Sequence, residues 1–131
     1  MAIQYSTTHR TNAMTQLNTD IGSSAQIKIY TGTPPSTVAT AFTGTLLVTL
    51  TGNAGGFGTA SAAQLTASAI TAANAVATGT AGYFRIATSG GTDVVQGTIG
   101  TSGTDLTINN TSIASGQNVT ASSLVITATG A

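Results

Sequence analysis

Apolar and polar residues alternate along most of the chain beyond Gly22, which is the pattern of β-strands with one buried face. Six stretches show this alternation most clearly and predict strands over residues 26–30, 45–51, 83–88, 93–99, 105–109 and 123–128. Weaker patterns predict strands at 61–66, 70–76 and 117–120. We expect the alternating apolar side chains, such as Ile27, Ile29, Phe84 and Ile86, to form the core.

Short runs of Gly, Ser, Asn and Thr separate the predicted strands and indicate turns. Residues 89–92, Ser-Gly-Gly-Thr, lie between two strands and predict a tight hairpin, because glycine readily adopts positive φ. Several short strands at fairly even spacing are typical of a sandwich or jelly roll. The sequence therefore predicts a mainly β fold, an antiparallel β-sandwich or jelly-roll-like domain with one N-terminal α-helix.

The helix is predicted by a change of spacing before Gly22. Four apolar residues recur at intervals of three and four and mark one helical face: Ala13, Met14, Leu17 and Ile21. We expect a helix over residues 8–21, capped by Thr7 or Thr8 and ended by Gly22. Residues 1–7, with Ile3 and Tyr5 alternating, predict an extended arm, and residues 8–131 predict one domain.

Two segments stand out by composition. Residues 58–80 are rich in Ala and Thr, and we interpret them as strand and loop rather than helix. The only two prolines, Pro34 and Pro35, follow the first strand. Because proline cannot donate to a sheet, we expect this pair to make a stiff exit from the strand.

Charge is scarce in this chain. Only 5% of residues are charged, against about 25% in ordinary soluble domains. Three cations and three anions cannot build the basic patch that nucleic acid requires, which excludes that partner class. No stretch is long and apolar enough to span a membrane, and the N-terminus lacks a signal-peptide pattern. A net charge of zero favours association between copies.

No residue pattern indicates catalysis, a metal or a cofactor. His9 is the only histidine, and Asp20 would lie about 16 Å from it along a helix, so the two cannot act together. Asp93 and Asp105 follow Gly-Thr pairs near turns, and we interpret them as caps of their own turns. The glycines of residues 52–58 follow a strand without a phosphate-loop ending, so we interpret them as a turn.

Two cations lie within predicted strands. Arg85 faces away from Phe84 and Ile86, so we expect it to point to solvent or to an ion-pair partner across an interface. Lys28 allows the same two interpretations.

Several of these segments, taken together and in order, resemble a family of small β-rich structural proteins of tailed bacteriophages. The similar segments are residues 29–35 (IYTGTPP), 79–86 (GTAGYFRI), 96–106 (QGTIGTSGTDL) and 110–117 (NTSIASGQ). The resemblance implies a virion component of the head decoration or cement type, located on the capsid surface and made in the bacterial cytoplasm. Residues 52–80 depart from the family pattern, since they are rich in Gly, Ala and Thr where the family often has aromatic residues and more charge.

The resemblance and the low charge content together indicate the expected partners. We expect a homo-oligomer, a dimer or a trimer, that binds the major capsid protein without nucleic acid, membrane or cofactor. The candidate interface residues are Ile3, Tyr5, Met14, Leu17, Lys28 and Arg85. A tail- or fibre-associated module and a carbohydrate-binding β-domain stay open as alternatives.

Overall fold

One helix precedes twelve short strands in the computed structural model, which describes residues 3–130. The helix is α1 (Thr7–Ile21). The strands are β1 (Gln26–Thr31), β2 (Leu46–Thr51), β3 (Gly58–Ser61), β4 (Gln64–Ala67), β5 (Ala73–Asn74), β6 (Gly79–Ala87), β7 (Asp93–Gly97), β8 (Ile99–Gly100), β9 (Leu106–Ile108), β10 (Ser112–Ile113), β11 (Asn118–Val119) and β12 (Ala121–Thr127). The predicted mainly β fold with one N-terminal helix is confirmed.

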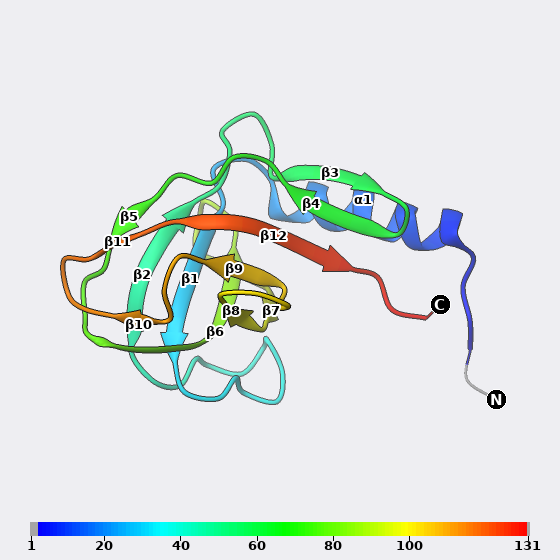
Figure 1. Cartoon of the computed structure of the whole chain (residues 1–131). Coiled ribbons are helices and arrows are strands. Elements are labelled where there is room, and N and C mark those ends of the chain that lie inside the picture. Colours follow the sequence, from blue (N-terminus) through cyan, green and yellow to red (C-terminus); the bar gives the residue numbers. More distant parts are fainter. Residues whose placement is uncertain (1–2, 131) are drawn as a thin grey trace.

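Two five-stranded sheets make up most of the molecule. The first has the order β10-β6-β1-β2, with β7 also paired to β6, and the second has the order β3-β4-β12-β9-β8. Strands β5 and β11 form a small third sheet. All pairings are antiparallel except that of β8 with β9. In Figure 1 the long strand β12 crosses over β1, β2 and β6, so the two large sheets lie in layers.

The two large sheets share one hydrophobic core, and its residues come from the alternating positions. From the first sheet it takes Ile27, Ile29, Val48, Leu50, Phe84 and Ile86. From the second sheet it takes Leu65, Leu106, Ile108 and Leu124. The period of two in the sequence therefore predicted these core side chains, but not the burial of Tyr30, Tyr83 and Arg85 on the other side of the first sheet.

The segment 58–80 contains the main difference in strand positions. A single strand was predicted over 61–66, but the structure has two strands, β3 and β4, joined by a turn at Ala62 and Ala63. Both turn residues have positive φ, 50° and 63°, which alanine rarely adopts. Hydrogen bonds from elsewhere hold them: Ala63 N donates to Thr11 Oγ1 over 2.9 Å, and Ala128 N donates to Ala63 O over 2.9 Å. Of the strand predicted at 70–76, only β5 forms, beside a single bridge between Thr51 and Thr71.

Helix α1 begins one residue earlier than predicted, and its cap is Ser6 rather than Thr7 or Thr8. The Ser6 hydroxyl accepts a hydrogen bond from His9 N over 3.1 Å. Gly22 ends the helix as predicted, with φ 75° and its N–H donating to Asn18 O. The helix lies along β3 and β4, away from the first sheet (Figure 1). No helix among residues 3–130 is long and apolar enough to span a membrane.

The predicted hairpin between β6 and β7 is confirmed. Gly91 has φ 94° and its N–H donates to Thr88 O over 2.9 Å, while Thr88 N donates to Thr92 O over 2.9 Å. This hairpin places β7 beside β6 at the edge of the first sheet. Gln96 of β7 is thereby set opposite Arg85 of β6, which decides the surroundings of the arginine.

Candidate functional site

The predicted interface residues lie in two separate places. Ile3 and Tyr5 are exposed, at 75% and 49%, and Met14 and Leu17 are half-buried on α1. Lys28 and Arg85 lie instead on the first sheet, directly opposite each other on β1 and β6. The structure therefore brings together the arm and the helix but not all six residues.

The N-terminal arm is tied to the C-terminal end of the chain at Tyr5. Tyr5 N donates to Gly130 O over 2.6 Å, and Arg10 Nε donates to Tyr5 O over 3.3 Å. The Tyr5 ring lies 4.9 Å, between centroids, from the ring of His9. These contacts fix the arm at its base, while Ile3 extends beyond them into solvent.

A groove lies between the first half of α1 and the segment that follows β12. Its volume is about 260 Å³. It is lined by Tyr5, His9, Arg10, Ala13, Met14, Ala128 and Thr129. Two of the predicted interface residues, Tyr5 and Met14, thus share one concave surface, and the exposed Ile3 precedes Tyr5 by two residues.

Arg85 contradicts the expectation that it points to solvent, because only 1% of it is exposed. It does face away from the core, as predicted, but residues 32–45 fold back over that side of the sheet and cover it. We call these residues, which join β1 to β2, the strap. Arg85 Nη1 pairs with Asp93 Oδ2 at 3.0 Å, and Arg85 Nε donates to Gln96 Oε1 over 3.2 Å. The expected ion-pair partner therefore lies in the same chain.

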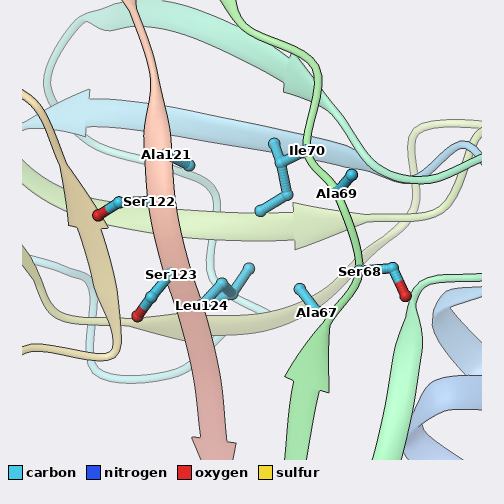
Figure 2. A pocket seen from close by; sticks show the side chains of 8 residues that line it. All are labelled: Ala67, Ser68, Ala69, Ile70, Ala121, Ser122, Ser123 and Leu124. Carbon is cyan, nitrogen blue, oxygen red and sulfur yellow. The ribbon is translucent and has the colours of Figure 1, made fainter.

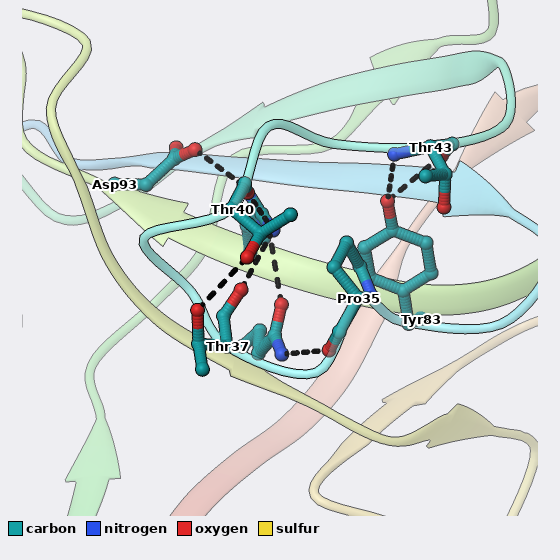
Figure 3. A network of polar contacts seen from close by, with 8 residues as sticks. Pro35, Thr37, Thr40, Thr43, Tyr83 and Asp93 are labelled. Carbon is teal, nitrogen blue, oxygen red and sulfur yellow. Dashed lines mark hydrogen bonds and ion pairs between the residues drawn. The ribbon is translucent and has the colours of Figure 1, made fainter.

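The same guanidinium also holds the strap. Arg85 Nη2 donates to Thr40 O over 2.7 Å and to Thr37 O over 3.4 Å. Gln96 adds a second tie, since its Nε2 donates to Pro35 O over 2.8 Å. Figure 3 shows these contacts converging on the strap from the sheet below it. The proline pair thus leads into a segment that side chains of β6 and β7 bind through its backbone oxygens.

Aromatic side chains hold the other end of the strap. Tyr83 Oη donates to Thr43 O over 2.8 Å and accepts from Thr43 N over 3.1 Å (Figure 3). The Tyr30 ring is stacked between Phe42, with centroids 4.8 Å apart, and Tyr83, 5.1 Å apart. Burial raises the pKa of Tyr30 above its ordinary value, and the nearby Asp93 and Tyr83 add to the rise, while Arg85 opposes it.

The two aspartates do not cap their own turns, which corrects the prediction. Asp93 pairs with Arg85, and its other oxygen, Oδ1, is buried without a hydrogen-bond partner. Asp105 Oδ2 accepts from Thr98 N and from Thr98 Oγ1, each over 3.0 Å, and so links the start of β9 to the end of β7. Both carboxylates therefore join segments that are separate in the sequence.

His9 is exposed. Across residues 3–130, no three His, Cys, Asp or Glu side chains lie close enough together to hold a metal ion. Within the glycine-rich residues 52–58, a turn forms at 53–56, in which Asn53 Oδ1 accepts from Gly55 N over 2.7 Å.

A second hollow, of about 220 Å³, lies where the pairing of β4 with β12 is interrupted. The pairing ends at Thr66 and Val125, and the pairing of β5 with β11 begins at Ala73 and Val119. Figure 2 shows Ile70 and Leu124 reaching into the gap, with the hydroxyls of Ser68 and Ser122 turned away from it. The hollow is therefore lined mostly by alanine and serine, with Ile70 and Leu124 as its two larger apolar side chains.

The sequence did not indicate that residues 32–45 cover the outward side of the first sheet or that side chains of β6 and β7 bind them. The available signals were a stretch of 14 residues without a predicted strand and a cation on the polar side of a strand. Neither indicates which surface the segment covers.

Comparison with protein-family models, with curated proteins and with solved structures found no match to this chain.

Proposed function

We propose that the chain is a non-enzymatic structural protein of a tailed-bacteriophage virion, a decoration or cement protein that binds the outer capsid surface as a homo-oligomer. The proposal starts from the four sequence segments that resemble such proteins. The two large sheets around one core are compatible with a structural module. The major capsid protein is the proposed second partner.

The observation that carries the proposal is how little charge the folded surface bears. Six side chains of the chain are charged, and Arg85 and Asp93 neutralise each other beneath the strap. Only Arg10, Asp20, Lys28 and Asp105 are left for a surface of 6517 Å². Like-charge repulsion between neighbouring copies is therefore small, which favours dense association.

The arm is the proposed contact element. Ile3 is 75% exposed, and Tyr5, two residues later, lines the groove together with Met14. Covering an isoleucine of this exposure on association is worth about 2 kcal/mol. We propose that Ile3 packs against a second copy or against the capsid.

Replacing Ile3 by Ser tests this contact. We expect Ile3→Ser to weaken self-association, or binding to capsids, by about tenfold, because the apolar area it buries is lost. The measurements are sedimentation velocity of the purified protein and co-sedimentation with heads of the phage that encodes it. The free energy of unfolding of the monomer should not change.

Val76→Ser is the matched control, since Val76 is also a β-branched residue, is 70% exposed and lies far from the arm in the sequence. It should associate as the unmodified chain does. Normal association of the Ile3→Ser variant would show that the arm is not the contact.

The location on the virion is tested separately. Immunogold labelling of intact virions should decorate heads at a regular copy number. Label confined to tails or fibres would replace the decoration proposal by the tail-module alternative, and unlabelled virions would contradict both.

One observation favours the carbohydrate-binding alternative. Phe42 is 52% exposed and is held by its stack on Tyr30, and a fixed aromatic face of this kind can pack against a sugar ring. A glycan-array signal that disappears in Phe42→Ala would support that function. An array without any signal would contradict the carbohydrate-binding alternative.

A further inference from the structure

The strap is attached to the sheet almost entirely by polar groups and one aromatic stack. None of residues 32–45 is buried, and the segment contains neither helix nor strand. Its attachments come from side chains of the sheet, mainly Arg85, Gln96 and Tyr83, and from the contact of Phe42 with Tyr30. Segments that bury few apolar groups open locally at a lower free energy than the core does.

The two tyrosines beneath the strap are, by contrast, fully covered. Tyr30 and Tyr83 are 2% and 0% exposed, although both lie on the side of the first sheet that faces away from the shared core. They share that side with Arg85 and Gln96. The strap is what separates this aromatic and cationic surface from solvent.

Arg85 contributes both a cost and a gain in free energy to the closed arrangement of the strap. Closing removes a guanidinium from water, which is costly. In the closed arrangement Arg85 forms hydrogen bonds with Asp93, Gln96 and the strap oxygens, which offset this cost. These hydrogen bonds do not offset the full cost of removing the charges from water, because Asp93 Oδ1 is buried without a hydrogen-bond partner. Opening would rehydrate both charged groups without disturbing the strand pairing of β1 with β6.

We infer that residues 32–45 form a lid that opens as one unit from an intact sheet, with Arg85 as its latch, and that the open form exposes Tyr30 and Tyr83. The inference does not depend on the proposed function. It requires only that the strap opens more readily than the strands beneath it.

Hydrogen exchange of the full-length chain, followed residue by residue by NMR, tests the lid. The amides of Thr43 and Thr45 are suitable reporters, since they donate to Tyr83 Oη and Thr31 Oγ1. In the unmodified protein we expect them to exchange at least about tenfold faster than the amides that pair β1 with β6. Equal rates for both sets would show that the strap opens only on global unfolding and would overturn the inference.

The Arg85→Gln variant tests whether Arg85 holds the strap closed. We expect the two strap amides to exchange a further tenfold or so faster relative to the β1–β6 amides, because two ties to the strap oxygens are removed. Gln96→Ala, which removes the tie to Pro35 without changing a charge, should act in the same direction. Lys28→Gln is the matched control, since Lys28 lies opposite Arg85 in the same sheet and makes no hydrogen bond to the strap.

Chymotrypsin cleavage after Phe42 gives a second readout of the same opening. Cleavage should be faster in Arg85→Gln than in Lys28→Gln under conditions where both are folded. If Arg85→Gln accelerates the exchange of strap amides and sheet amides equally, Arg85 stabilises the whole fold rather than holding the strap closed, and the inference is overturned.

Discussion

At the scale of single residues, Gly82 decides how the strap leaves the first sheet. The pairing of β1 with β6 shifts between Tyr30, opposite Tyr83, and Thr31, opposite Ala81, which leaves Gly82 as the extra residue of a bulge. A β-carbon at Gly82 would run into the backbone of Gly32, the first residue of the strap. Only glycine fits this approach.

We therefore expect Gly82→Ala to lower the free energy of unfolding by about 2 kcal/mol, since the strap backbone would have to move. Urea denaturation followed by circular dichroism measures the change. Gly90→Ala is the control, because the nearest atom to a β-carbon there, Thr88 Oγ1, lies 3.8 Å away. A Gly82→Ala variant as stable as Gly90→Ala would contradict the close approach.

Tyr30 gives a prediction at alkaline pH. Its pKa in the folded chain is raised above the ordinary 10.0, chiefly by burial, so the folded state holds the phenolic proton more tightly than the unfolded state does. The stabilisation from Tyr30 is complete below the ordinary pKa and is lost as the pH rises through the raised pKa.

We expect the free energy of unfolding to fall as the pH is raised above about 10, and to fall less steeply in Tyr30→Phe. Urea denaturation at a series of alkaline pH values measures both slopes. Equal slopes for the two proteins would show that Tyr30 ionises alike in the folded and unfolded chain.

At the scale of elements, the apolar face of α1 is weak, and contacts with residues far away in the sequence help to position the helix. Of the four residues predicted to lie on one helical face, only Ile21 is buried, Met14 and Leu17 are half-buried, and Ala13 is exposed. Asn18 adds a polar attachment: its Oδ1 accepts from Gly58 N and its Nδ2 donates to Gly58 O, each over 3.0 Å. The helix is thus fixed to β3 mainly at its C-terminal end.

The other end of α1 depends more on its cap. We expect Ser6→Ala to cost about 1 kcal/mol of unfolding free energy, because His9 N loses its acceptor. Thr8→Ala, which removes a predicted but unused cap, should have a smaller effect. Urea denaturation of both variants distinguishes them, and a larger loss in Thr8→Ala would reassign the cap.

At the scale of the whole molecule, the fold separates two surfaces. The arm and the groove lie where the two ends of the chain meet, since Tyr5 bonds to Gly130 (Figure 1). The strap covers the outward side of the first sheet. Association through the arm and opening of the strap can therefore be tested independently, by Ile3→Ser and Arg85→Gln.

The sequence by itself determined the β class, most strand positions, the β6–β7 hairpin, the end of the helix and the scarcity of charge. These follow from local causes: the period of two, glycine at turns and composition. It also placed Arg85 correctly on the side of β6 away from the core.

Only the tertiary structure decided what happens on that side. Arg85 binds oxygens of Thr37 and Thr40, 48 and 45 positions away, and Gln96 binds an oxygen 61 positions away. The Ala62–Ala63 turn is likewise held by Thr11 and Ala128 rather than by its own residues. A local pattern states which way a side chain points, but whether water or another segment covers it depends on contacts between residues far apart in the chain.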